Sequence, residues 1–184
     1  MFARTNRLTL RPGWAEDAPA LARAIAHDSV VMKLAQAPWP YTLRDAEWWL
    51  ASRAAAAHDD VACLILAHEG AAEPRLVGCI GIHPTEEGHE LGYWLTPGAW
   101  DRGYATEAGR AMIANARDTL GLTRLVSGHF VDNPGSGRVL TKLGFAPTGR
   151  IEQRASRARR TRVPCATYTL DLADEGRPPV PLAA

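Results

Sequence analysis

Apolar and polar side chains alternate along the chain with two different periods, which separate the segments expected to form strands from those expected to form helices. Residues 7–11 alternate charged or hydroxyl side chains with leucine, the period-two pattern of a half-buried strand. In residues 15–27 and 42–57 the apolar positions recur every three or four residues, so we expect a helix in each. The hydroxyl of Thr42 and the carboxylate of Asp45 stand three residues apart, a spacing that favours a helix start.

The second half of the pattern predicts a meander of strands followed by alternating helices and strands. Short turns rich in glycine and proline, within residues 70–74 and 84–88, separate three apolar segments, so these are expected to pair antiparallel. The three expected strands are 61–67, 76–83 and 90–95. The elements expected after them are a helix at 105–120, a strand at 122–130, a helix at 135–143, and closing strands at 145–151 and 163–172.

This order of elements predicts an α+β fold. At 184 residues the chain has the length of one domain, which we place at residues 1–172. The proline-rich residues 173–184 are expected to form a flexible C-terminal tail. The apolar runs are far shorter than the roughly 20 residues of a membrane span, and residues 1–11 lack the apolar core of a signal peptide. We therefore expect a cytoplasmic protein without a membrane partner.

Charge is balanced over the whole chain but divided between its halves. The net charge is +1, yet residues 1–100 carry 8 basic and 12 acidic side chains, whereas residues 101–184 carry 13 and 8. A basic half favours an anionic ligand bound there. The cysteines, Cys63, Cys79 and Cys165, are isolated in apolar runs, so we expect buried thiols and neither disulfides nor a metal site.

Residues 91–108 carry the clearest chemical signal in the chain. A strand is followed by a short loop centred on Gly103 and then by a helix, so backbone N–H groups of the loop and helix start converge, a geometry that binds phosphate. Gly103 allows close approach of the backbone, and Arg102 adds a cation. A strand-to-helix turn without a ligand would leave the same pattern, so this stretch alone leaves both interpretations open.

Residues 100–105, Trp-Asp-Arg-Gly-Tyr-Ala, resemble the acetyl-CoA pyrophosphate loop of the GNAT superfamily of N-acetyltransferases, whose pattern is Gln/Arg-x-x-Gly-x-Gly/Ala. Two positions depart from the usual pattern, because Trp100 replaces Gln or Arg and Asp101 occupies a position that is often glycine. Three further segments resemble the RimJ/RimL-like N-terminal-alanine acetyltransferases: residues 5–11, residues 92–95 with 103–108, and Asp-Asn-Pro-Gly-Ser at 132–136 leading to 142–145. The resemblance extends over about residues 4–172.

The resemblance implies a fold and a donor site. The fold is a mixed, mostly antiparallel central sheet of about seven strands with flanking helices, in which the strands at 93–95 and 122–130 splay apart. The pantetheine arm would lie in the gap like an added strand, hydrogen-bonded to main chain near Trp94 and Leu95. The remaining implied contacts of acetyl-CoA are Arg102, Gly103, Tyr104, Ala105, Thr106, Asn133 and Ser136.

Asn133 and Ser136 follow a strand at the entry to a helix, where the resemblance implies that they lie beside the thiol of the donor. Asn133 would bind the pantetheine, and Ser136 would give a proton to the departing thiolate. Side chains of these types also cap helices, and that alternative stays open. A hydrolase triad of His129, Asp132 and Ser136 is disfavoured because no Gly-x-Ser-x-Gly surrounds the serine.

Acetyl transfer to an amine requires the neutral amine. At pH 7, deprotonating an α-amine costs about 1 kcal/mol and a lysine side chain about 4–5 kcal/mol, so an N-terminal acceptor needs only a modest base. Glu90 is our candidate to accept that proton through water, because strand alternation places it on the face of Gly92 and Trp94. The alternative is a surface carboxylate grouped with Glu86 and Glu87.

Aromatic and basic residues outside this core complete the predicted site. Trp39, in a loop between two prolines, is the candidate for the rim of the acceptor groove, whereas core packing is the expectation for Trp48 or Trp49. Residues 154–162 contain five arginines and are expected first to form a solvated hairpin tip. RNA, an acidic substrate segment or the 3′-phosphate of the donor remain alternatives, although nucleic acid is disfavoured because no aromatic residues are interleaved.

The sequence thus predicts an acetyltransferase that moves acetyl from acetyl-CoA to a primary amine by direct attack in a ternary complex. A protein N-terminal α-amine is the leading acceptor, because of the RimJ/RimL-like resemblance. A small amine or an aminoglycoside is the alternative acceptor, and an acyl-CoA-binding module without turnover is the alternative function. No metal is required, since the histidines lack the paired spacing of a zinc site. The sequence leaves a homodimer open.

Overall fold

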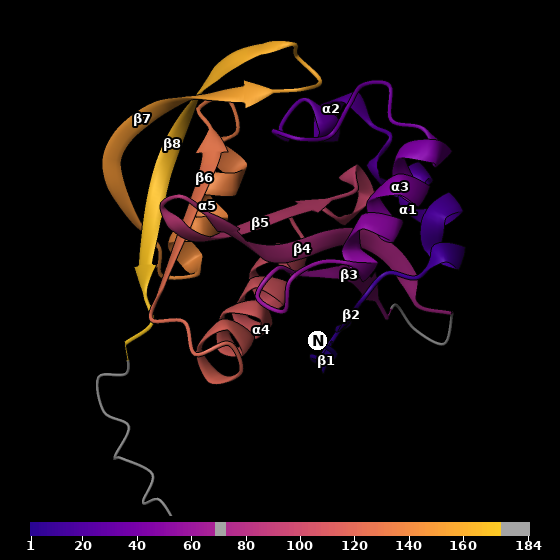
Figure 1. The fold of residues 1–184 in the computed structure, drawn as a ribbon, viewed down its shortest axis with the longest axis horizontal. Helices are drawn as coiled ribbons and strands as arrows, with labels where there is room; N and C mark the ends of the chain where they lie inside the picture. Colours follow the sequence, from indigo (N-terminus) through magenta and orange to yellow (C-terminus); the bar gives the residue numbers. More distant parts are fainter. Residues whose placement is uncertain (69–72, 174–184) are drawn as a thin grey trace, which may run out of the picture.

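One mixed sheet of eight strands organises the protein, in the order β1-β2-β3-β4-β5-β6-β8-β7 (Figure 1). The computed structural model describes residues 1–68 and 73–173, so most of the predicted turn at 70–74 and the predicted tail at 173–184, except Ala173, lie outside the described residues. The strands are β1 Ala3–Arg4, β2 Leu8–Arg11, β3 Val61–Ala67, β4 Arg75–Thr85, β5 Gly88–Leu95, β6 Arg124–Phe130, β7 Ala146–Ser156 and β8 Thr161–Asp171. The strand beyond the seven expected is β1, which at two residues is too short to show a period.

Four of the helices begin and end close to where periodicity and capping residues place them, and the fifth, a short helix at Asp28–Val31, was not predicted. They are α1 Ala18–Ile25, α2 Asp28–Val31, α3 Leu43–Ala54, α4 Tyr104–Asp118 and α5 Pro134–Lys142, with single turns η1 Ala15–Asp17 and η2 Pro97–Ala99. The capping box predicted for α3 is confirmed: the Asp45 amide donates to the Thr42 hydroxyl at 3.3 Å, and the Thr42 amide donates to the Asp45 carboxylate at 2.9 Å. Among the residues that the structure describes, no helix is long and apolar enough to cross a membrane.

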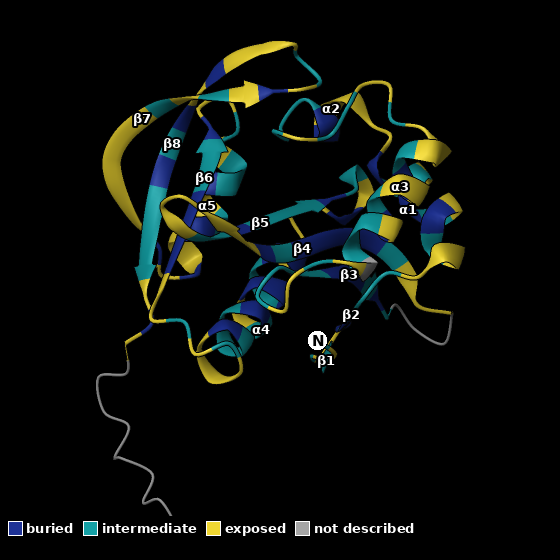
Figure 2. Ribbon diagram, viewed as in Figure 1, coloured by how far each residue is buried: buried dark blue, intermediate teal, exposed yellow. Residues whose placement is uncertain are grey.

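The core lies on both faces of the central strands, which explains why β3 is an unbroken apolar run. Cys63, Ile65 and Ala67 pack into the cluster that includes α4, whereas Leu64 and Leu66 face α1 and α3. Buried positions are accordingly concentrated on β3 and β4 (Figure 2). The three cysteines are buried and free, as predicted, and burial raises the pKa of Cys63 to about 11 and that of Cys79 to about 12.

The sheet opens between β5 and β6, its one parallel pair within residues 1–68 and 73–173. These strands pair only through His89 with Leu125 and Glu90 with Val126, although β5 continues to Leu95 and β6 to Phe130. The β4–β5 pair, by contrast, is antiparallel along the whole of β5. The strands therefore separate beyond Glu90, as the resemblance implied.

The closing hairpin differs from the predicted one. Strand β7 runs on to Ser156 and β8 starts at Thr161, so the tip is only Arg157–Arg160, and Arg154 and Arg162 are strand residues. The hairpin arches toward the segment after α2 (Figure 1), where the Arg157 amide donates to the Ala35 carbonyl at 2.8 Å. The predicted solvated tip is confirmed only in part: Arg157 and Arg160 are exposed, but backbone and side chains of the hairpin end bond to residues 32–35.

Candidate functional site

A cavity of about 1540 Å³ lies where β5 and β6 separate. Its walls come from β5, the loop before α4, β6, the first turn of α5, the inner side of β7 and the segment before α3. The predicted site residues that line it are Glu90, Trp94, Leu95, Gly103, Tyr104, Ala105, Thr106, Asn133 and Ser136. The fold thus brings together residues that lie up to 46 positions apart in the sequence. Arg102 and Trp39 are not among the lining residues.

The loop before α4 turns through left-handed backbone at two positions, with φ of 57° at Asp101 and 77° at Gly103. Glycine adopts this conformation freely, but aspartate does so only with strain. Gly103 is the N-cap of α4, and its carbonyl accepts the first intrahelical hydrogen bond from the Glu107 amide at 3.0 Å. The amides that precede Glu107 have no acceptor within the helix, so they present donors to the cavity at the positive end of the helix.

Thr5 and Arg7, in the turn between β1 and β2, clamp this loop. The Arg7 guanidinium bonds the Glu107 carboxylate, with Nε to Oε2 at 2.8 Å, and its Nη1 donates to the Arg102 carbonyl at 2.9 Å. The Thr5 hydroxyl and the Arg7 amide donate to the other Glu107 oxygen at 2.6 and 2.9 Å. Although burial opposes it, these hydrogen bonds and the charge of Arg7 lower the pKa of Glu107. The Arg102 side chain lies over the Tyr104 ring, so its proposed contact with the donor stays a prediction.

The backbone of β5 alternates between the closed side of the sheet and the gap. Ser127 of β6 donates to the Leu91 carbonyl at 2.8 Å, so the backbone groups of residue 91 point toward β6. By strand alternation Tyr93 and Leu95 point the same way, into the opening, whereas Trp94 points toward β4. The Trp100 indole donates to the Leu95 carbonyl at 2.9 Å. The open groups are therefore the amide and carbonyl of Tyr93 and the amide of Leu95, so Leu95 is one of the two expected residues and Tyr93 takes the place of Trp94.

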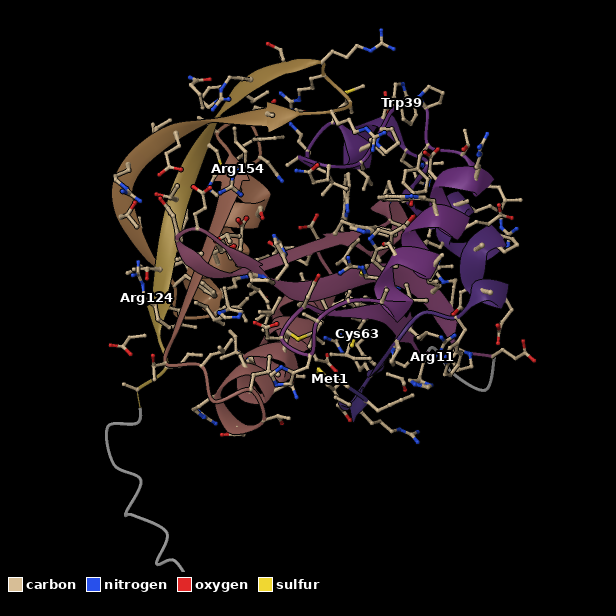
Figure 3. The ribbon with its side chains drawn as sticks, in the orientation of Figure 1. Met1, Arg11, Trp39, Cys63, Arg124 and Arg154 are labelled. Atoms are coloured by element: carbon tan, nitrogen blue, oxygen red, sulfur yellow. The ribbon has the colours of Figure 1, made fainter. Side chains whose placement is uncertain are left out.

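Glu90 lies within the cavity and forms an ion pair with Arg154 of β7. The two side chains are only 14% and 31% exposed, so the pair is partly shielded from water. Figure 3 shows Arg154 on the side of β7 that faces β5. Burial acts to lower the pKa of Arg154, but the charge and hydrogen bond of Glu90 outweigh it and raise the pKa, which keeps the guanidinium charged. Arg154 is thus not a freely solvated side chain, and Glu90 is not a surface carboxylate like its neighbours Glu86 and Glu87, which are exposed.

Asn133 and Ser136 lie at the start of α5, on the face of β5 opposite to Glu90. Asn133 is the N-cap residue, but its side chain makes no capping hydrogen bond, and none is found for it to any described residue. Asn133 lines the cavity, so the hydrogen-bonding groups of its side chain are available to a ligand there. The Ser136 Oγ lies 2.7 Å from the hydroxyl of Tyr93. Burial raises the pKa of Tyr93 to about 12. Tyr93 was not among the predicted site residues. Strand alternation from Glu90 would have placed it on the opposite face of β5, the face that Ser136 contacts.

One tryptophan of α3 packs in the core, as expected for the pair. Trp49 packs against the cluster of α1 and α3, whereas Trp48 is 67% exposed and lines the cavity. Trp39 is 37% exposed in the loop beside α2 (Figure 3), where its proposed contact with an acceptor stays a prediction. Adjacent residues of a helix point about 100° apart, so only one of the pair on α3 fits the core.

The tip of the β7–β8 hairpin is tied to the loop that carries Asn133. Arg159 donates from Nε to the Met32 carbonyl at 2.6 Å and pairs through Nη1 with Asp132 at 2.8 Å. Lys33 pairs with the same carboxylate at 3.3 Å. Hydrogen bonds from Arg159 and Lys33 lower the pKa of Asp132. Asp132 thus connects the segment after α2, the hairpin and the loop before α5.

Two cationic side chains of α5, Arg138 and Lys142, also line the cavity. Neither was among the predicted site residues. Their spacing of four residues places them on one face of the helix. No group of three or more His, Cys, Asp or Glu side chains able to hold a metal occurs in residues 1–68 and 73–173.

Comparison with known proteins identifies what this arrangement is similar to. The family model described as Acetyltransferase (GNAT) domain matches residues 7–146. The uncharacterized N-acetyltransferase YoaA of Bacillus subtilis (strain 168) is 36% identical over 81 residues, which cover 42% of this chain and 46% of that protein, so the chain spans about half the length of that relative.

Solved structures share the fold over nearly the whole chain. A GNAT-family acetyltransferase from Bacillus anthracis superposes with a TM-score of 0.78 at 21% identity, covering 93% of this chain and 98% of that one. A proposed ribosomal-protein-serine acetyltransferase from Vibrio cholerae gives 0.74 at 20% identity, covering 93% and 97%. The family match includes the open β5–β6 pair and the loop before α4, and we conclude that this chain belongs to the GNAT acetyltransferase family, which uses acetyl-CoA as its donor.

Proposed function

We propose that the protein transfers acetyl from acetyl-CoA to an N-terminal α-amine of a protein, by direct attack in a ternary complex. The observation that carries the proposal is the position of two polar groups on opposite faces of β5 at the opening, Glu90 on one and Ser136 on the other. A thioester held between them would have a proton acceptor on the side of the attacking amine and a donor on the side of the leaving sulfur.

Three sets of groups fit the donor. The amides of the first turn of α4 suit the pyrophosphate, the backbone of Tyr93 and Leu95 suits the amide groups of the pantetheine arm, and the unpartnered Asn133 side chain suits its end. Arg138 and Lys142 add positive charge on the cavity wall. Acetyl-CoA supplies the thioester carbonyl that the amine attacks, and the residues of this chain orient it and move the protons.

The state of Glu90 favours an acceptor that is easily deprotonated. One oxygen of its carboxylate is engaged by Arg154, so the proton of the amine would pass to the other oxygen or through a water. Carboxylates as a class are weak bases at neutral pH, which suits an α-amine much better than a lysine side chain, where about 4–5 kcal/mol would be needed. This difference supports an N-terminal amine over a lysine. The segments resembling the RimJ/RimL-like branch support it too.

The experiment that tests this function measures thiol release from acetyl-CoA with matched acceptors. One peptide has a free N-terminus and an internal lysine, a second is the same peptide with its N-terminus formylated, and an aminoglycoside is the third acceptor. We expect release only with the free N-terminus, and mass spectrometry should place the acetyl group there. Equal rates with both peptides, or release with the aminoglycoside alone, would reject the proposed acceptor.

Two variants test the role of Glu90 in the same assay. Glu90→Gln removes the proton acceptor and is expected to lower kcat by roughly a hundredfold. Glu86→Gln removes a neighbouring exposed carboxylate and should change kcat by less than about twofold. A Glu90→Gln enzyme as active as Glu86→Gln would leave Glu90 without a catalytic role.

A further inference from the structure

The phenol of Tyr93 bridges the two elements that bound the opening. Its hydroxyl extends from β5 to the first turn of α5, where it lies 2.7 Å from Oγ of Ser136, a contact in which either oxygen can donate. The one phenol proton can also reach the Ser136 carbonyl oxygen at 3.3 Å, but Oγ is the nearer acceptor. Both residues line the cavity, and Tyr93 is partly buried against the α4 side of the core. The Ser136 hydroxyl has this one hydrogen-bond partner among the described residues.

Which group donates in this pair determines where the serine proton points. Burial raises the pKa of Tyr93 to about 12, while the hydrogen bond with Ser136 acts in the opposite direction, so the phenol keeps its proton at neutral pH. A serine hydroxyl has one proton and two lone pairs and rotates freely unless a neighbour fixes it. When the phenol donates to Oγ, it occupies a lone pair and leaves the serine proton directed elsewhere, toward the cavity.

A serine without such a neighbour is a poor acid, because negative charge builds up on its oxygen as the proton leaves. A hydrogen bond donated to that oxygen stabilises the charge, as donors in an oxyanion hole do. The donor must be in place before the reaction, since only a preorganised group stabilises charge without first reorienting. Tyr93 meets this requirement because β5 holds it from the opposite side of the opening.

We propose that Tyr93 is the positioning residue of Ser136: it donates to Oγ, turns the serine proton toward the leaving sulfur and stabilises the charge that develops on the serine oxygen. This inference rests on the proposed function. As the C–S bond breaks, its electron pair stays on sulfur and the Ser136 proton passes to sulfur. Ser136 then recovers a proton from solvent, which receives one from the attacking amine by way of Glu90. Tyr93 keeps its own proton throughout.

A double-mutant cycle tests the inference with the free-N-terminus peptide as acceptor. Tyr93→Phe removes one oxygen and is expected to lower kcat about tenfold, with the KM for acetyl-CoA changed by less than about twofold. Ser136→Ala should lower kcat at least as far. In the Ser136→Ala background Tyr93→Phe should have no further effect on kcat, because the hydroxyl that Tyr93 serves is gone.

A purely structural role for Tyr93 would give a different pattern. It would lower kcat by the same factor in both backgrounds, or raise the KM for acetyl-CoA instead, and either result overturns the inference. A wild-type kcat in Ser136→Ala overturns it as well. Tyr168→Phe is the matched control, because the Tyr168 hydroxyl faces His129 at 3.4 Å and no hydrogen bond joins it to Ser136.

The wild-type enzyme is assayed first on the same peptide. Failure of the proposed function would appear as absent thiol release in the wild type. Failure of this inference appears only in an active wild type, as independent losses in the cycle. Binding of acetyl-CoA to each variant, measured by titration calorimetry, should be unchanged within about twofold if the donor site is intact.

Discussion

The Arg7 guanidinium reaches from the N-terminal end of the sheet to the first turn of α4, where its Nη2 lies 2.7 Å from Oε2 of Glu107. Arg7 also holds the Arg102 carbonyl, so one side chain fixes both the loop before α4 and the helix that follows it. The Cβ of any residue replacing Gly103 would lie 3.4 Å from the Arg7 guanidinium, which shows how closely the two segments pack. The segments at 5–11 and 103–108, separate in the sequence, thus pack together at the start of α4.

Removing this clamp should weaken donor binding. Glu107→Gln keeps the size of the side chain but loses its charge, so we expect a loss of about 1–3 kcal/mol in the free energy of unfolding. The KM for acetyl-CoA should rise, because the amides at the start of α4 lose their fixed orientation. Asp118→Asn is the matched control, since it removes an exposed ion-pair carboxylate at the other end of the same helix. Equal effects of the two variants on KM would contradict the role of the clamp.

Asp101 combines two unfavourable features in the proposed pyrophosphate site. Its φ of 57° lies in the left-handed region, and Asp101 is one of the residues that line the cavity, where it brings a negative charge. Asp101→Gly relieves the strain and removes the charge, so acetyl-CoA should bind roughly two- to tenfold more tightly at low salt, with a smaller gain at high salt.

Asp101→Asn separates the two effects, because asparagine removes the charge but retains a side chain at the left-handed position. Titration calorimetry at two salt concentrations should show that most of the affinity gain is already present in Asp101→Asn. Unchanged or weaker binding in both variants would show that the carboxylate does not face the pyrophosphate.

Two glycines of the central strands should differ in how much stability they lose when replaced by alanine. A Cβ at Gly78 would collide with the Trp94 carbonyl and lie 2.7 Å from Cδ2 of Leu95, so Gly78→Ala is expected to destabilise the protein by about 1–3 kcal/mol. At Gly92 the nearest atom would be 3.7 Å away, so Gly92→Ala should change stability by less than about 1 kcal/mol. Urea denaturation measures both, and similar losses would contradict the packing of β5 against β4.

Asp17 should contribute stability that depends on pH. It accepts two hydrogen bonds of 2.7 Å from Arg11 and one from the Trp14 amide, and these lower its pKa although burial opposes them. Because the folded-state pKa lies below the unfolded value, the stabilisation is complete above about pH 4 and is lost as the pH falls through the folded-state pKa.

Asp17→Asn should therefore cost about 1–3 kcal/mol at pH 7 and progressively less at lower pH. Glu16→Gln, which changes an exposed neighbouring carboxylate, should show no such difference. Unfolding free energies from urea titrations at pH 7, 5 and 3 provide the comparison. A difference between Asp17→Asn and the wild type that stayed constant with pH would contradict the assignment.

Periodicity predicted the central strands and the longer helices because each buries apolar side chains at regular intervals. The same reasoning missed residues 152–156 of β7, where Arg154 bonds across the cavity to Glu90 and Glu152 pairs with Arg150 of the same strand, so these charged side chains do not pack in the core. Arg154 therefore looked like a residue of a solvated tip. Its partner Glu90 is 64 positions away, and no local pattern connects the two.

Local sequence predicted the part of the candidate site that is formed by main-chain groups. It did not predict the contacts between side chains that are distant in the sequence. Gly103 and the start of α4 were found from local sequence, because a loop that enters a helix determines its own amide directions. The contact of Tyr93 with Ser136 depends on how β5 and α5 approach each other across the opening. Strand alternation could have assigned the face of Tyr93, but only the fold supplies its partner.

The most direct test of the central claim is the initial-rate pattern of thiol release when acetyl-CoA and a free-N-terminus peptide are varied together. Direct attack in a ternary complex predicts double-reciprocal lines that intersect. Parallel lines would indicate an acetylated enzyme intermediate. They would contradict direct transfer of acetyl from the thioester to the amine in the site that Glu90 and Ser136 bound. Absence of thiol release with every peptide would contradict the proposed acetyl transfer to protein N-termini.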